Sequence, residues 1–319
     1  MTLAPVLIPT LNRYEHLEKC LNSLSQCTLA NQTEVFIALD YPPTEKYIDG
    51  WKKNRDYLIS IGNLNFKKIH LIERLENYGT WRPGDKGNAT CLIDDISKLY
   101  DRYIFTEDDN VFAPNFLEFM NKGLTLFEND DKVFAISSYR WWFPIKYENN
   151  TFFRQSFDYT PWGVAKWVRK DLQIKDCSWF KSQITFNNIV NLLRKCDFQA
   201  LGSLFEFACK KHKDDILIDQ HFRVIMALKN QHMIIPTTQL VQNIGLDGSG
   251  ESMPSSGLEL QKLYEAIPLS TQKHFEYIGT GYEYFEKNNK TYKYGKEWQG
   301  QFYYFIKMLK KMCKYFFIG

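Results

Sequence analysis

The chain has 319 residues, of which 44% are hydrophobic and 16% aromatic, and its formal net charge is +3. This length suits one large domain or two fused ones with an ample core. So small a net charge gives no general case for a nucleic-acid partner, and no stretch approaches the roughly 20 apolar residues that a membrane-spanning helix needs.

The seven cysteines are scattered along the chain and include no Cys-x-x-Cys pair. This usage is typical of reduced thiols in a cytoplasmic protein. The first residues, MTLAPVLIPTLN, lack the basic start and long apolar stretch of a signal peptide. We therefore expect a cytoplasmic protein.

Short apolar runs alternate with segments of helical periodicity in the first half of the chain. Five of these runs predict buried strands, over residues 4–8, 34–39, 68–72, 103–106 and 133–137. Apolar residues at helical spacing predict helices over 14–24, over 89–99 and after Pro114. Strands that alternate with amphipathic helices indicate an α/β fold with a mostly parallel sheet flanked by helices.

The second half has a different texture. Aromatic residues become dense after Ser138, and the regular alternation is lost. Helices are predicted over 184–196 and 218–229, and a late strand over 233–236. A loop rich in glycine and serine, NIGLDGSGESMPSSG, follows at 243–257.

Three consecutive acids, Glu107, Asp108 and Asp109, end the predicted strand at 103–106. Ligands of open α/β sheets bind beyond the carboxyl ends of the strands, and Asp40 also follows such a strand. Neighbouring carboxylates repel one another, so a cluster needs a cation or donor groups to offset its charge. A hard divalent metal with oxygen ligands would do so; the alternative is a solvated acidic turn before the next helix.

Three segments resemble nucleotide-sugar glycosyltransferases of the GT-A (Rossmann-like) fold. PVLIPTLNRYEHLEKCLNSL (5–24) is similar to their first strand, polar turn and helix. FTEDDNVFAPNFLEFM (105–120) resembles the metal-binding strand end of the inverting N-acetylglucosaminyltransferases of the animal Golgi and of bacterial family-2 enzymes. LVQNIGLDGSG (240–250) is similar to a loop in bacterial transferases of surface polysaccharides. The tail from Glu251 is not covered.

The resemblance implies an inverting, metal-dependent hexosyl- or N-acetylhexosaminyltransferase. Its donor would be a nucleotide diphosphate sugar, in the first place a UDP-sugar, and its acceptor a glycan or lipid-linked saccharide in surface polysaccharide or lipopolysaccharide synthesis. Asp109 would bind the Mn²⁺ or Mg²⁺ ion of the diphosphate, Asp108 the ribose or sugar, and Glu107 the sugar hydroxyls. We expect a nucleotide-sugar half at 1–140, an acceptor and catalytic half at 141–250, and an extension at 251–319.

Residues after the first and second strands are expected to line the nucleotide pocket. The turn after the first strand offers Pro9, Thr10, Asn12 and Arg13; the alternative is an ordinary strand-to-helix turn with Asn12 as the helix N-cap. Asp40 could accept hydrogen bonds from the uracil or ribose, or be a plain turn acid before two prolines.

Two further segments are expected to contact the substrates. A glycine-rich connection would pass over the phosphates, unless it is a solvated loop, and carries Asn77, Arg82 and Lys86. An aromatic stretch, TPWGVAKW, would lie under the sugar and acceptor, unless its tryptophans belong to the core, and carries Trp162, Gly163 and Trp167.

The catalytic base is expected in the second half. In the Golgi enzymes it is an aspartate near the start of a late helix, with an arginine shortly after, and Asp219 followed by Arg223 fits this pattern best. Asp215 is the second candidate.

The tail at 302–319, FYYFIKMLKKMCKYFFIG, contains four lysines and no acid. It could lie on the inner face of the cytoplasmic membrane as a basic amphipathic segment, or pack on the domain as a helix with exposed lysines. Two other functions also remain open on the sequence. One is a sugar nucleotidyltransferase, although IPTLNR lacks the glycines of such enzymes, and the other is a non-catalytic glycan-binding protein.

Overall fold

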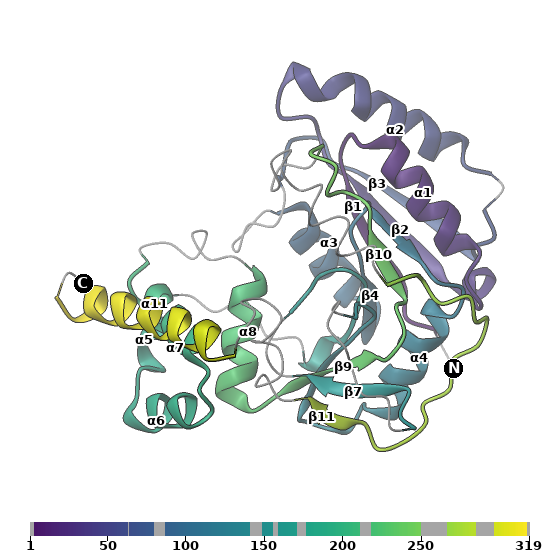
Figure 1. Cartoon of the computed structure of the whole chain (residues 1–319). Helices are drawn as coiled ribbons and strands as arrows, with labels where there is room; N and C mark the ends of the chain where they lie inside the picture. The colour runs from purple at the N-terminus through teal and green to yellow at the C-terminus, as the bar shows by residue number, and fades with distance from the viewer. Residues whose placement is uncertain are drawn as a thin grey trace.

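The computed structural model describes residues 3–62, 64–79, 87–140, 149–155, 159–170, 177–210, 218–249, 267–284 and 297–317. Within these residues a nine-stranded sheet runs through the molecule in the order β11-β7-β9-β6-β8-β4-β1-β2-β3 (Figure 1). Helices flank this sheet, and a separate group of helices lies beyond one end of it. The predicted α/β class, with a mostly parallel sheet flanked by helices, is confirmed.

Four parallel strands form one side of the sheet: β4 (Arg102–Phe105), β1 (Val6–Thr10), β2 (Glu34–Leu39) and β3 (Lys68–Glu73). Their connections include the helices α1 (Tyr14–Ser25), α2 (Ile48–Ser60) and α3 (Asn88–Ser97), and the short 3₁₀ turns Ala30–Gln32 and Glu45–Tyr47. Because the four strands run parallel, their carboxyl ends meet at one edge of the sheet.

The other side of the sheet is mixed. Its strands are β6 (Val133–Ser137), β7 (Phe152–Gln155), β8 (Val164–Trp167), β9 (His232–Pro236) and β11 (Tyr282–Tyr284). β8 lies between β4 and β6 and is antiparallel to both. β9 runs parallel to β6, whereas β7 runs antiparallel to β9 and parallel to β11. The sequence predicted β6 and β9 but neither β7 nor β8.

The sheet is covered on both faces. Val6 and Ile8 of β1 pack with α1 and with α4 (Phe116–Leu126), whereas Leu7 points to the other face and packs with α3 and α8 (Ile218–Lys229). This alternation follows from the period of two along a strand. The helix predicted over 89–99 ends at Ser97, and Leu99 is 71% exposed instead of buried.

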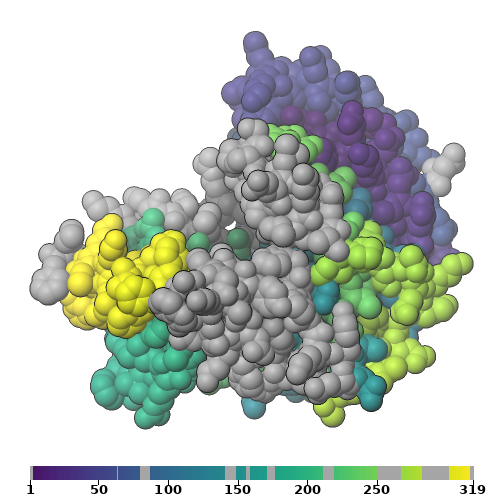
Figure 2. Space-filling view, in the orientation of Figure 1, coloured from purple at the N-terminus to yellow at the C-terminus, as the bar shows by residue number. Residues whose placement is uncertain are grey.

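A third apolar cluster holds the helical end of the chain together. It joins α5 (Cys177–Ser182), α6 (Phe186–Arg194), α7 (Phe198–Ala208), part of α8, and α11 (Glu297–Phe317). α11 packs along α7 and buries Met308 there. Figure 2 shows α11, in yellow, against the teal helices, well apart from the purple N-terminal segment. For the tail, this arrangement matches the packed-helix alternative.

Three further features complete the description. The 3₁₀ turn Val168–Lys170 follows β8. All seven cysteines are in the reduced thiol form. None of the described helices is long and apolar enough to cross a membrane.

Candidate functional site

The three acids lie in the segment between β4 and a short strand, β5 (Asn110–Phe112). β4 pairs with β1, so this segment starts beside the carboxyl end of β1 and the turn that follows it. The Thr10 hydroxyl, at the end of β1, donates a 2.7 Å hydrogen bond to Asp108 and accepts one from the Asn54 amide of α2. The fold therefore brings together two segments that were predicted as parts of the site, the turn after β1 and the acid cluster.

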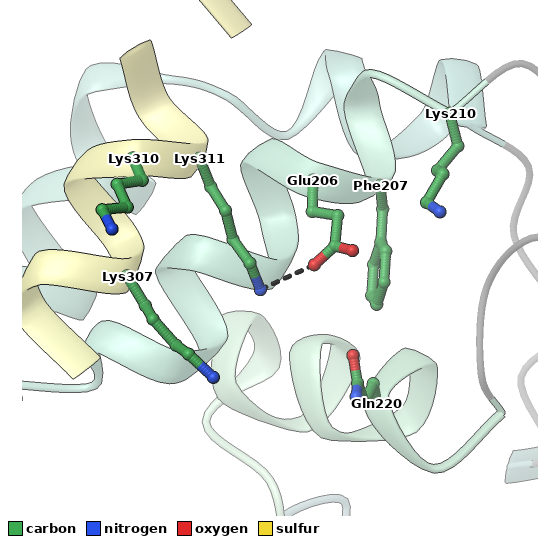
Figure 3. Close-up of a pocket in the computed structure, with 7 residues that line it drawn as sticks. All are labelled: Glu206, Phe207, Lys210, Gln220, Lys307, Lys310 and Lys311. Carbon is green, nitrogen blue, oxygen red and sulfur yellow. Dashed lines mark ion pairs between the residues drawn. The ribbon is translucent and has the colours of Figure 1, made fainter. Parts of the chain in front are cut away.

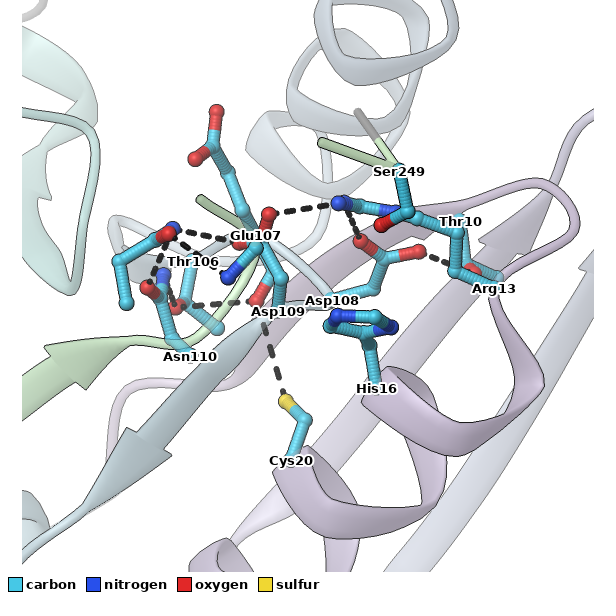
Figure 4. A network of polar contacts seen from close by, with 12 residues as sticks. Thr10, Arg13, His16, Cys20, Thr106, Glu107, Asp108, Asp109, Asn110 and Ser249 are labelled. Atoms are coloured by element: carbon cyan, nitrogen blue, oxygen red, sulfur yellow. Dashed lines mark hydrogen bonds and ion pairs between the residues drawn. The ribbon is translucent and has the colours of Figure 1, made fainter. Parts of the chain in front are cut away.

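Arg13 links the two aspartates. Its Nη2 lies 2.6 Å from Oδ1 of Asp108 and 2.8 Å from Oδ2 of Asp109 (Figure 4). All three side chains are largely buried. Burial alone would lower the pKa of Arg13, but the charges of the two aspartates raise it overall. The guanidinium is therefore the cation that offsets the repulsion between these carboxylates.

The third part of the site is the start of the loop that the sequence predicted at 243–257. β5 pairs antiparallel with β10 (Val241–Asn243) in a two-stranded ribbon, so the second and third of the three segments that carry the resemblance lie side by side. The Asn243 amide donates a 2.7 Å hydrogen bond to Oδ1 of Asp109. Gly245 follows, and a Cβ there would lie 2.0 Å from Oδ2 of Asp109. Only glycine fits this position without moving the carboxylate.

Glu107 differs from its neighbours in its proton affinity. Burial and the charges of Asp109 and Asp108 raise its pKa to about 8, and the charge of Asp219 adds to the rise. Burial also raises the pKa of Asp109, although Arg13 opposes this effect. Glu107 is therefore protonated over much of the neutral range, and the cluster is less negative than three ionised carboxylates would be.

A divalent metal ion can be tested against these donors. Carboxylate oxygens are the ligands that Mg²⁺ and Mn²⁺ prefer. The described residues, however, contain no group of three His, Cys, Asp or Glu side chains that could hold a metal, and Arg13 and Asn243 both contact Asp109. The donor chemistry thus fits an open site that a ligand's phosphates would complete, rather than a preformed protein cage.

Asp40 lies at the end of the neighbouring strand β2 and is buried. Its carboxylate accepts hydrogen bonds from the backbone N–H groups of Tyr41, Tyr78 and Gly79 and from the Asn77 amide. Burial raises the pKa of this carboxyl despite those donors. Asp40 and Asn77 therefore fasten the connection after β3 to the edge of the sheet, a role that the sequence did not suggest.

The remaining donor-side predictions have mixed outcomes. Pro9 lies inside β1 and is partly buried. Asn12 as the helix N-cap is wrong, because α1 begins at Tyr14 and its cap position is Arg13, without a side-chain cap bond. Arg82 and Lys86 lie outside the described residues.

The aromatic stretch divides between the site and the core. Val164 pairs with Phe105, so Trp162 and Gly163 lie at the same edge of the sheet as the acids. Trp162 is only partly buried, and its ring meets that of Tyr139 edge to face. Trp162 also packs against the first core cluster, and its contact with a ligand stays a prediction.

Trp167 does not fit its predicted contact with the acceptor. It pairs with Arg102, at the opposite end of β4 from the acids. Its ring is 1% exposed, and its indole N–H donates to the Leu124 carbonyl of α4. A side chain enclosed by the core at the far edge cannot reach a sugar bound beside Asp109.

Asp219 lies in the first turn of α8, with its side chain exposed. Desolvation by the surrounding protein still raises the pKa of this carboxyl, although part of the residue reaches solvent. Its charge also acts on Glu107, so the predicted base and the acid cluster are electrostatic neighbours. Arg223 is instead buried and bonded to Asp197, and Asp215 lies outside the described residues.

Two contributors to the site, Asn243 and Asn54, were missed as individual residues. Asn243 lies in the quoted loop motif, but its contact with Asp109 spans 134 positions of sequence. Asn54 belongs to α2, which the sequence did not predict. No local pattern marks either residue, because Asn243 contacts Asp109 and Asn54 contacts Thr10 only after distant segments have folded together.

No protein-family model and no curated protein matches the sequence. Similar solved structures include S. aureus TarS 1-349 in complex with UDP-GlcNAc, with 13% identity and a TM-score of 0.40 over 98% of this chain and 81% of that one. Another S. aureus TarS structure has 11% identity and a TM-score of 0.39 over 84% of this chain and 41% of that one, so this chain spans less than half its length.

A third similar structure is the mannosyltransferase PcManGT from Pyrobaculum calidifontis in complex with GDP-Man and Mn²⁺. It has 12% identity and a TM-score of 0.38 over 97% of this chain and 86% of that chain. Likeness at this level does not assign a function to the chain, which has to be argued from its own site.

Gly163→Ala should destabilise the protein. Gly163 has a φ of +66°, and an added Cβ would lie 2.3 Å from the Ser138 hydroxyl and 2.9 Å from the Phe116 ring. The left-handed backbone and the clash together should lower the free energy of unfolding by about 2–4 kcal/mol. Urea unfolding measures this, with Gly62→Ala as the control, because the nearest atom there is 3.9 Å away. Equal stability of both variants would contradict the geometry.

Glu107→Gln should remove a loss of stability at high pH. Since the folded pKa of about 8 exceeds the ordinary 4.5, the folded state holds its proton more tightly, and the free energy of unfolding falls as pH rises from 4.5 to 8. Glutamine cannot lose a proton, so the variant should exceed the wild type by about 1–3 kcal/mol at pH 9 and match it near pH 4. Exposed Glu45→Gln is the control, and a pH-independent difference would refute the assignment.

Proposed function

We propose that the protein is a glycosyltransferase that uses a nucleotide diphosphate sugar, with UDP-sugars as the first candidates. The observation that supports it is the meeting of Asp108 and Asp109 with Thr10, Arg13 and the β10 loop beyond the ends of adjacent strands. In α/β sheets this is where nucleotides and their phosphates bind. Such a site would suit the GT-A arrangement that the sequence resembles.

We further propose that donor binding requires Mn²⁺ or Mg²⁺, with Asp109 as the protein ligand. Two carboxylates, Asp108 and Asp109, pair with one guanidinium among the described residues of the cluster, and a diphosphate adds more negative charge. When bound, the ion would act as a Lewis acid that neutralises the leaving diphosphate. Arg13 would keep the aspartates in place, and Asp108 and Glu107 would contact the ribose and sugar.

The transfer step is proposed as a single displacement with inversion. The acceptor oxygen bonds to the anomeric carbon as the bond between that carbon and the diphosphate breaks, and the nucleoside diphosphate leaves. Asp219 takes the proton of the acceptor hydroxyl. Its exposed position at the start of α8, close enough to act on the charge of Glu107, supports this role. Trp162 would lie against the apolar face of a sugar ring.

The acceptor and the setting follow only from the sequence resemblance. We propose transfer of a hexose or N-acetylhexosamine to a glycan or lipid-linked saccharide of a surface polysaccharide. The reaction would take place on the cytoplasmic side of the membrane.

Asp109→Asn should abolish metal-dependent donor binding. Calorimetry with UDP and Mn²⁺ should show at least a tenfold loss of affinity, about 1.4 kcal/mol, because an amide binds a hard cation weakly. Asp101→Asn is the control, since Asp101 precedes the opposite end of β4 and pairs with Arg102 on the surface. Unchanged UDP binding by the Asp109 variant would refute its role, and Mn²⁺-independent binding by the wild type would refute the metal.

Asp219→Asn should impair the chemical step and spare donor binding. Loss of a general base should lower kcat by about 10²–10⁴-fold, measured as UDP release from a panel of UDP-sugars, with UDP affinity unchanged. Asp215→Asn should have a much smaller effect. Full activity of the Asp219 variant would exclude it as the base. Release of pyrophosphate from a nucleoside triphosphate would instead indicate a nucleotidyltransferase.

A further inference from the structure

A recess of about 560 Å³ lies between the helices α7, α8 and α11 (Figure 3). It belongs to the helical end of the molecule rather than to the sheet. Its lining is mostly cationic and consists of Glu206, Phe207, Lys210, Gln220, Lys307, Lys310 and Lys311. A volume of this size accommodates a phosphorylated sugar or a short stretch of a charged polymer.

The lysines of the recess outnumber its acid. Lys311 forms a 2.6 Å ion pair with Glu206. No carboxylate of the described residues pairs with Lys210, Lys307 or Lys310. In Figure 3 the Lys307 side chain points from α11 toward the recess, and the Lys210 side chain lies beside Phe207, just after the end of α7. Two ammonium groups without a carboxylate partner among the described residues therefore approach one space from opposite walls. That of Lys307 also lies 4.5 Å from the centre of the Tyr303 ring, and an anion placed in the recess would be favoured by both ammonium groups.

The helix that carries these lysines is fixed by its apolar face. Met308 of α11 is buried against α7, and the neighbouring Phe305 and Leu309 join the same cluster. At Gly202 of α7, an added Cβ would lie only 3.2 Å from the Met308 backbone. Since this face is already covered by protein, α11 does not offer it to a bilayer. Its lysines instead form one wall of a fixed recess.

The recess and the proposed catalytic site share one helix. Gln220 lines the recess, and the residue before it in the first turn of α8 is Asp219. Consecutive residues of a helix are about 1.5 Å apart along its axis. They also point about 100° apart around that axis, and Asp219 does not line the recess. A molecule held in the recess would therefore have to extend around the first turn of α8 to bring its next unit to the carboxylate assigned as the base.

We propose that this recess binds a phosphate group of the acceptor, and that the protein transfers sugar to a phosphate-bearing saccharide or polyol. This proposal rests on the function proposed above, because it gives that reaction its acceptor. The lysines would hold the phosphate, Gln220 would donate to it or to a neighbouring hydroxyl, and the adjoining unit would present its hydroxyl to Asp219.

Tripolyphosphate serves as the probe, with the full chain studied by calorimetry. The paired substitution Lys210→Gln and Lys307→Gln should weaken binding about tenfold. Lys314→Gln, an exposed lysine of α11 outside the recess, should leave it unchanged. Absence of binding, or equal binding by both variants, would overturn the proposal, because the recess would then contribute no more than general surface charge.

Glu206→Gln provides a test of opposite sign. It removes the one acid of the recess and releases Lys311 from its ion pair, so tripolyphosphate should bind several-fold more tightly. A misfolded variant would not gain affinity. Weaker or unchanged binding by this variant would contradict the proposed site.

Two further measurements separate the sources of failure. UDP binding in the presence of Mn²⁺ should be the same in the Lys210/Lys307 variant and the wild type. If UDP binds to neither, the proposed donor site fails while the phosphate result stands.

Vesicles of phosphatidylglycerol supply phosphate from a lipid headgroup. Co-sedimentation that the paired substitution abolishes would overturn the acceptor assignment in favour of a membrane contact, and no co-sedimentation by the wild type would support the acceptor.

Discussion

The contact on which the site depends is the ion pair of Arg13 with two adjacent aspartates. Asp108 and Asp109 are nearly enclosed, at 8% and 10% side-chain exposure, and two such charges would repel each other strongly without a cation. The guanidinium also links the turn after β1 to the segment after β4. The same contact therefore balances the charge and fixes the relative positions of these two segments. Removing one partner of a buried pair is costly because the other charge stays uncompensated, which makes this contact a structural condition for any ligand bound nearby.

The same ion pair constrains how a metal could act. An ion that approached Asp109 would meet a carboxylate whose two oxygens already accept from Arg13 and Asn243. Its positive charge would also oppose that of the guanidinium. Only a ligand that brings its own negative oxygens changes this balance, so ion and diphosphate are expected to bind together rather than in sequence. The pKa of Glu107 is raised first by burial and then by the same two charges, because a third negative charge beside the pair is disfavoured.

Local patterns predicted the framework because each strand from β1 to β4, and β6, is an apolar run bounded by polar residues. β8 escaped notice because its sequence, VAKW, carries a lysine: Lys166 is buried, with its ammonium 4.0 Å from the centre of the Phe222 ring. This aromatic neighbour comes from the distant helix α8, and sequence spacing does not reveal it. Trp167 was misassigned for a related reason, since an aromatic residue near a site motif and one in the core look alike until the register of β8 against β4 is known.

The predicted pieces were joined by contacts that no local pattern encodes. The pairing of β5 with β10 brings together residues more than a hundred positions apart. In a similar way, α8 connects the sheet with the helical cluster. Phe222 and Met226 of that helix pack on the sheet, whereas Val224 and Ala227 pack on the helical cluster. A helix with two covered faces is held firmly from both sides, so its first turn, with Asp219, is placed by the sheet and by the helices around the lysine recess at once. A change on either side would therefore reach Asp219 through this one element.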